Sequence, residues 1–152
     1  VNDGQSKEIL LAFDFGLARI GIATANLRTK TASPLTTLKN GRMLPWADLD
    51  HLIDQWAPSQ LVVGLPSTRQ ETPFSSSAKA FAQSIHEKYQ LPVAIIDESL
   101  TSRAASAELR EARHLGFLPR RIKKNQIDSW AACLIARQWM SEQVDKCKTV
   151  VP

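Results

Sequence analysis

The sequence predicts an α/β fold: a mixed five-stranded sheet in the element order β-β-β-α-β-α-β-α-α, with helices on both faces. Three observations indicate this fold. The chain opens with three strand-like segments that are separated by short turns. Two later apolar runs each follow a segment of helical spacing, which is typical of parallel strands joined by crossover helices. No apolar run approaches the ~20 residues of a membrane span, so a membrane protein is not expected.

The opening segments predict an antiparallel meander. Residues 9–13 are apolar without alternation, as in a strand that is covered on both faces. Gly16 permits a tight turn, residues 19–24 are typical of a returning strand, and residues 32–40 complete the meander. The first strand carries one acid, Asp14. A buried carboxylate there needs a basic side chain, a backbone donor or a metal to compensate its charge.

Helices and strands alternate in the rest of the chain. Length favours a single domain, residues 1–152, with a core at about residues 9–142 and a flexible tail at residues 144–152. The expected elements are a helix within residues 44–58, a strand within 59–66, a helix within 74–90, a strand within 91–98, a helix within 101–113 and a helix at about 126–143.

Composition narrows the class of protein. The balance of 43% hydrophobic and 22% charged residues is that of an ordinary globular protein. The first residues lack the basic end and apolar centre of a signal peptide, so a cytoplasmic protein is expected. Cys133 and Cys147 form neither a metal-ligand spacing nor a disulfide framework, and the three histidines are scattered. Neither a zinc site nor a catalytic histidine is therefore expected.

Acidic residues lie where the predicted topology brings strand ends together. Asp14 ends the first strand, and Asp97 and Glu98 end the last, at the edge where open α/β sheets bind ligands. Asp97 and Glu98 point to opposite faces, and either one alone is better explained as a turn former or part of a helix cap. The expected approach to Asp14 is what favours a functional role. Asp128 heads an inward apolar stripe of the last helix. The alternative for Asp128 is a capping-box-like pair with Asn125.

Carboxylates that converge on one edge need a cation. Oxygen ligands without His or Cys favour Mg²⁺ or Mn²⁺ over zinc. In a two-ion mechanism for phosphodiester hydrolysis, Asp14 bridges the ions while Glu98 and Asp128 hold one each.

Basic residues are concentrated between residues 103 and 124, where seven Lys or Arg stand against two acids. A solvated helix face and a phosphate-binding surface explain this charge about equally well. The candidate nucleic-acid contacts are Arg19, Arg103, Arg110, Arg113, Arg120, Arg121, Lys123 and Lys124.

The chain resembles the YqgF/RuvX family through four ordered motifs: AFDFGLARIGIA, LVVGLP, DESLTS and IDSWAACLIA. The resemblance spans about residues 9–140. It implies an RNase H-like fold and a metal-dependent endonuclease for structured nucleic acid, either the 5′ end of pre-16S rRNA or Holliday-junction-like DNA, acting as a monomer or a weak homodimer. The family's acidic triad maps onto Asp14, Glu98 and Asp128. The chain departs from the family at Ser99, where a basic residue is usual, and in the loop after GLP, which has no glycine.

Two other classes of protein share parts of this pattern. Proteins of the actin and sugar-kinase superfamily open with a similar D-x-G hairpin, but 152 residues leave no room for the second lobe that encloses a nucleotide. The other alternative is a non-catalytic nucleic-acid- or ribosome-binding module whose acids are vestigial. Divalent-metal-dependent cleavage by the purified protein separates that module from a nuclease.

Overall fold

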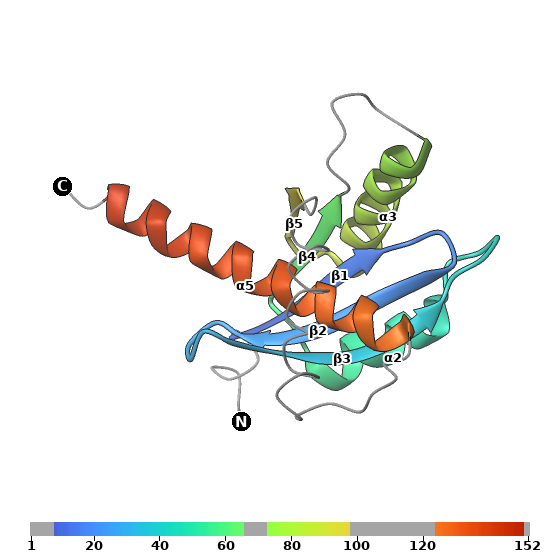
Figure 1. The fold of residues 1–152 in the computed structure, drawn as a ribbon, viewed down its shortest axis with the longest axis horizontal. Coiled ribbons are helices and arrows are strands. Elements are labelled where there is room, and N and C mark those ends of the chain that lie inside the picture. Colours follow the sequence, from blue (N-terminus) through green and yellow to red (C-terminus); the bar gives the residue numbers. More distant parts are fainter. Residues whose placement is uncertain (1–7, 66–72, 98–123, 151–152) are drawn as a thin grey trace.

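The computed structural model describes residues 8–65, 73–97 and 124–150 (Figure 1). Its strands are β1 (Ile9–Phe15), β2 (Arg19–Asn26), β3 (Thr31–Lys39), β4 (Gln60–Leu65) and β5 (Val93–Asp97). The helices within these ranges are α2 (Trp46–Trp56), α3 (Pro73–Tyr89) and α5 (Lys124–Val150). The helix predicted within residues 101–113 lies outside the described residues.

The five strands form one mixed sheet in the order β3-β2-β1-β4-β5. β1 pairs antiparallel with β2 and β2 with β3, whereas β1 and β4, and β4 and β5, pair in parallel. The predicted meander and parallel crossovers are therefore confirmed. Because β1, β4 and β5 run in the same direction, their carboxyl ends lie along one edge of the sheet.

Helices cover both faces of the sheet, as predicted. α5 crosses the near face in Figure 1, and α2 and α3 lie behind the sheet. On the α5 face, Leu10 of β1 packs in a buried cluster with Ile135. On the opposite face, Leu11 and Phe13 pack in a cluster with Phe81, whose ring meets that of Phe13 edge to face. Both faces of β1 are thus buried, which explains why its apolar residues do not alternate with polar ones.

Helix α5 is longer than predicted. It begins at Lys124 rather than Gln126 and continues to Val150 rather than ending near Gln143, so the tail expected to be flexible is helical through Val150. The physical reason is that no glycine or proline interrupts the chain after Gln143 until Pro152. No helix within the described ranges is both long enough and apolar enough to cross a bilayer.

Candidate active site

Asp14 lies near the carboxyl end of β1, on the face that α5 covers. Alternate residues of a strand share a face, and Leu10 and Ala12 both belong to the cluster that packs against α5. Asp14 is the next residue of this series, and it is half-buried where the residues before it are fully buried. The strand thus brings a carboxylate to the edge of the core beneath α5.

Glycines flank Asp14 on both neighbouring strands. In the sheet register, Asp14 is opposite Gly21 of β2 and Gly64 of β4. Paired residues point to the same face, so the positions beside the Asp14 side chain carry no side chain of their own. A carboxylate at this position is therefore not crowded by its strand neighbours.

Gly21 also brings Asp128 to Asp14. A Cβ atom added at Gly21 would overlap the backbone carbonyl oxygen of Asp128 and lie 2.9 Å from its Cβ. Opposite Cβ positions in an antiparallel pair are about 4.5–5.5 Å apart, and Asp14 is opposite Gly21. Because the Cβ position at Gly21 is in turn 2.9 Å from the Cβ of Asp128, the Cβ atoms of Asp14 and Asp128 are closer than about 8.5 Å. Two predicted site residues from distant parts of the sequence are thus neighbours on one face of the sheet.

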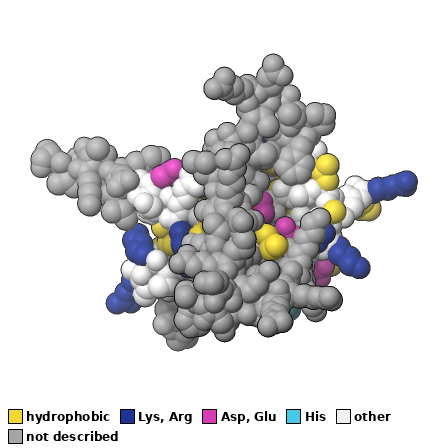
Figure 2. Space-filling model, in the orientation of Figure 1, with side chains coloured by type: hydrophobic (Ala, Val, Ile, Leu, Met, Phe, Trp, Pro, Cys, Tyr) yellow, Lys and Arg dark blue, Asp and Glu magenta, His cyan; other side chains and the backbone are white. Residues whose placement is uncertain are grey.

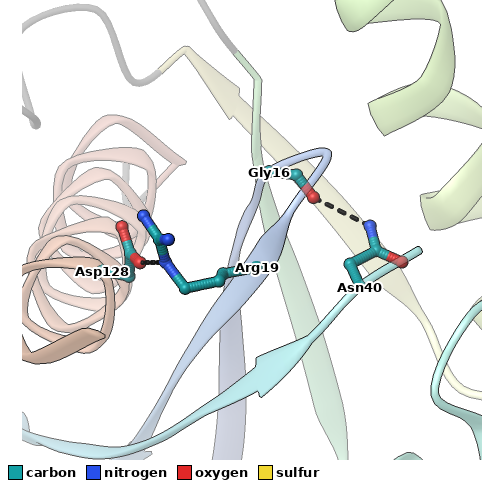
Figure 3. Close-up of polar contacts among 4 residues, drawn as sticks. All are labelled: Gly16, Arg19, Asn40 and Asp128. Atoms are coloured by element: carbon teal, nitrogen blue, oxygen red, sulfur yellow. Dashed lines mark hydrogen bonds and ion pairs between the residues drawn. The ribbon is translucent and has the colours of Figure 1, made fainter. Parts of the chain in front are cut away.

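Asp128 forms an ion pair with Arg19, the first residue of β2 (Figure 3). Arg19 Nε donates to Asp128 Oδ2 at 2.7 Å, and the two side chains are 33% and 23% exposed. The capping-box interpretation of Asp128 is wrong, because α5 begins at Lys124 and has no acid in its first turn, which places Asn125 inside the helix. The inward stripe is confirmed: Ala132 and Ile135 are fully buried.

Asn40 holds the turn that joins β1 to β2. Its Nδ2 donates to the carbonyl oxygen of Gly16, and its backbone N–H donates to that of Ala18, both at 2.8 Å (Figure 3). Gly16 is required by close packing, since a Cβ there would lie 2.6 Å from the carbonyl oxygen of Arg19. The turn predicted at Gly16 is confirmed, and its hydrogen bonds fix the backbone that carries both Asp14 and Arg19.

Several predicted site residues lie outside the described residues. β5 ends at Asp97, beside Leu65 of β4, and Glu98 follows it in the chain. The segment that carries most of the predicted phosphate contacts is also undescribed, as are Ser99 and the loop after GLP. The residues concerned are Glu98, Arg103, Arg110, Arg113, Arg120, Arg121 and Lys123, and of Lys124 only the backbone is described.

Three residues of the site were not among the predicted ones: Gly21, Gly64 and Asn40. A signal for Gly21 was present: the short turn after Phe15 pairs Asp14 with Gly21, and strand alternation places Arg19 on the same face. No comparable signal exists for Asn40, whose bond to Gly16 depends on where β3 ends.

Two nearby carboxylates, with Arg19 beside one of them, form a donor set of oxygen atoms. Such a set fits a hard divalent cation such as Mg²⁺ or Mn²⁺. Within the described residues, no group of three or more His, Cys, Asp or Glu side chains is close enough to bind a metal. Figure 2 shows acidic side chains near the middle of the α5 face, and both acidic and basic side chains toward its margins.

Comparison with known proteins relates the chain to nucleases. The RuvX family, described as Holliday junction resolvase, matches residues 8–142. A protein of Francisella tularensis subsp. mediasiatica with the name "Putative pre-16S rRNA nuclease" is 40% identical over 136 residues, which cover 88% of this chain and 96% of the relative. A protein of the same name from Francisella tularensis subsp. tularensis is 39% identical, with the same coverage.

Solved structures of resolvases share the fold. Thermus thermophilus RuvC in complex with a Holliday junction substrate has a TM-score of 0.57 and 13% identity, with 90% of this chain and 95% of that chain covered. The fowlpox virus Holliday junction resolvase has a TM-score of 0.57 and 12% identity, with coverages of 88% and 99%. The predicted RNase H-like fold is therefore confirmed.

Proposed function

Because the chain belongs to the RuvX family of Holliday junction resolvases, we propose that it is a metal-dependent endonuclease that hydrolyses phosphodiester bonds in structured nucleic acid. One observation carries the proposal most strongly. The half-buried acids Asp14 and Asp128 lie side by side on the α5 face, at the carboxyl end of β1. Ligands of open α/β sheets bind at this edge.

The proposed site holds Mg²⁺ or Mn²⁺, as two ions, through Asp14, Glu98 and Asp128. When bound, the ions supply an activated water molecule and stabilise the developing charge on the leaving oxygen. Asp14 is the central ligand of this proposal, since its strand partners Gly21 and Gly64 carry no side chain beside its carboxylate, and Gly21 lets the backbone of Asp128 approach. Glu98 directly follows β5, whose carboxyl end lies on the same sheet edge as that of β1.

Basic side chains are proposed to bind phosphate groups that flank the cleaved bond. The chain carries a formal net charge of +4, and its densest basic run is RRIKK at residues 120–124, immediately before α5. Cations in this position neutralise phosphates without reading sequence, as expected for a substrate recognised by its shape. The proposed contacts are Arg103, Arg110, Arg113, Arg120, Arg121, Lys123 and Lys124.

The proposed substrate is the 5′ end of pre-16S rRNA, with Holliday-junction-like DNA as the second candidate. The curated relatives that are 39–40% identical to the chain are named for the rRNA substrate. The structural neighbours named for Holliday junctions are only 12–13% identical to it, and they support the fold alone. The names of these relatives favour RNA, and the description of the matched family, Holliday junction resolvase, keeps junction DNA as the second candidate.

A cleavage assay with matched substrates tests this function. Purified protein is incubated with a pre-16S rRNA fragment and with a four-way DNA junction, in Mg²⁺, in Mn²⁺ and in EDTA. We expect metal-dependent cleavage of the RNA at a defined position, and no cleavage in EDTA. Cleavage of the junction alone would move the assignment to DNA. Tight binding without cleavage of either substrate would identify a non-catalytic binding module instead.

A further inference from the structure

The ion pair between Arg19 and Asp128 lies inside the candidate active site. Its N–O distance of 2.7 Å is that of a charge-assisted hydrogen bond. Neither side chain is fully exposed, at 33% and 23%, so the pair is less screened than one on the surface. The two residues are 109 positions apart in the sequence, and the pair therefore joins β2 to α5.

A rigid backbone presents Arg19 to this site. Arg19 begins β2, where it is paired with Lys39 of β3, and the adjoining turn is held by Asn40. Strand alternation places Arg19 and Gly21 on the same face, and Gly21 is the residue beneath the Asp128 backbone. The guanidinium, Asp128 and Asp14 therefore belong to one cluster of charges.

We propose that Arg19 is a positioning residue of the metal site and the internal cation of its two carboxylates. It holds Asp128 by donating from Nε to Oδ2, and this bond fixes the orientation of the carboxylate toward the metal site. In the metal-free protein, Arg19 offsets the repulsion between Asp14 and Asp128, and the metal takes over that role when it binds. This inference rests on the proposed metal-dependent function, and it gives Arg19 a role other than direct contact with substrate phosphate.

Arg19 and the metal are then two cations coupled through one carboxylate. Replacing Arg19 by the neutral residue Gln removes the cation that contacts Asp128, so the metal-free protein should melt at a lower temperature. The same change removes a positive charge that opposes the metal. The affinity for Mn²⁺, measured without nucleic acid, should therefore rise at least fivefold, the lower end of typical coupling between two sites.

Arg19→Lys separates charge from geometry. Lysine keeps the positive charge and would still bind a phosphate, but it lacks the planar Nε donor that contacts Oδ2. We expect Arg19→Lys to keep an Mn²⁺ affinity close to that of the wild type, and to cleave more slowly at saturating metal because Asp128 is no longer held. A role in phosphate binding alone would leave that single-turnover rate near the wild-type value.

Mn²⁺ titrations of the wild type, Arg19→Gln, Asp128→Asn and the double variant test the inference. We expect the effect of Arg19→Gln to disappear largely in the Asp128→Asn background, because Arg19 acts through Asp128. Two results together would overturn the positioning role of Arg19 in favour of a phosphate contact. The Mn²⁺ affinity of Arg19→Gln would equal that of the wild type, and the salt dependence of its nucleic-acid binding would be flatter by about one unit. If Arg19→Gln does not fold, the single-turnover cleavage rate of Arg19→Lys at saturating metal tests the inference instead. A rate below that of the wild type supports the positioning role, and an equal rate contradicts it. A wild type that binds no Mn²⁺ would instead refute the metal-dependent function itself, before any variant is compared.

Discussion

Gly21 of β2 lies so close to the backbone of Asp128 in α5 that even a methyl group between them would overlap the Asp128 carbonyl oxygen. The same glycine is the strand partner of Asp14. The approach of α5 to the sheet at this point therefore determines whether the two acids are neighbours.

Gly21→Ala should push α5 away from β2. The clash is with backbone, which cannot rotate aside, so we expect a loss of about 1–3 kcal/mol in the free energy of unfolding, typical of overpacking. Cleavage should fall with it, because Asp128 moves away from Asp14. Urea unfolding and a cleavage assay measure both effects. Gly41→Ala is the matched control, since an added Cβ there meets nothing within 4 Å. Equal stability and activity of the two variants would contradict the close packing.

Asp14→Asn should remove the response to metal and keep the fold. Neutralising Asp14 relieves its repulsion with Asp128, so the melting temperature in EDTA should hold or rise. In the wild type, Mg²⁺ at a hundred times its dissociation constant should stabilise the protein by about 2.7 kcal/mol, and the variant should lose most of this gain. Thermal melts with EDTA and with Mg²⁺ make the comparison, and Asp54→Asn, an exposed position on α2, is the control. A variant that melts lower in EDTA but keeps the full Mg²⁺ response would show that Asp14 is structural.

Charge reversal in the basic run before α5 should weaken nucleic-acid binding. The residues to change are Arg120, Arg121, Lys123 and Lys124. Each phosphate contact that is lost should flatten the salt dependence of the binding constant by about one unit, with similar effects on different sequences. Arg28→Glu with Lys30→Glu is the control, because these residues follow β2 at the opposite end of the sheet from Asp14. Binding that survives reversal of all four residues would assign this run to a solvated surface.

Tyr89 should titrate well above its ordinary range. Burial raises the pKa of Tyr89 above the usual 10.0, and the hydrogen bond from its hydroxyl to Asp50 Oδ1, at 2.6 Å, raises this pKa further. Because folding raises the pKa of Tyr89, the protonated hydroxyl stabilises the folded protein. This stabilisation is fully present below pH 10, the usual pKa, and is lost as the pH rises through the pKa of the folded protein. Tyr89 is the single tyrosine, so tyrosinate absorbance follows it directly.

The partner of Tyr89 provides the variant for that titration. Asp50→Asn should lower the pKa of Tyr89 but leave it above 10.0, because burial, the larger cause, remains. Asp54→Asn removes a charge from the same helix without touching this hydrogen bond and should leave the titration unchanged. Equal titration curves for the two variants would exclude a contribution from Asp50.

The order of elements and the position of Asp14 could be predicted because they depend on local patterns. The unbroken apolar run of β1 requires cover on both faces, and Gly16 permits the turn that reverses the chain. The end of α5 was predicted too early because no glycine or proline marks it before Pro152. The apolar stripe of α5 correctly placed Asp128 on the inward face.

The ion pair between Arg19 and Asp128 could not be predicted from sequence spacing. Its partners are 109 positions apart, and the choice of Arg19 among many basic residues depends on how closely α5 packs on Gly21. Asn40 likewise reaches Gly16 only because β3 ends beside the first turn. Contacts of this kind are set by the packing of elements and not by the residues next to them in the chain.

Single-turnover cleavage by Asp14→Asn, Asp128→Asn and the double variant tests most directly whether the two acids act as one metal site. Residues that act as a unit have non-additive effects on rate. We therefore predict that each single variant loses cleavage almost completely and that the double variant is no slower than the slower single one. Rate losses that multiply in the double variant, or wild-type cleavage by either single variant, would contradict a shared site.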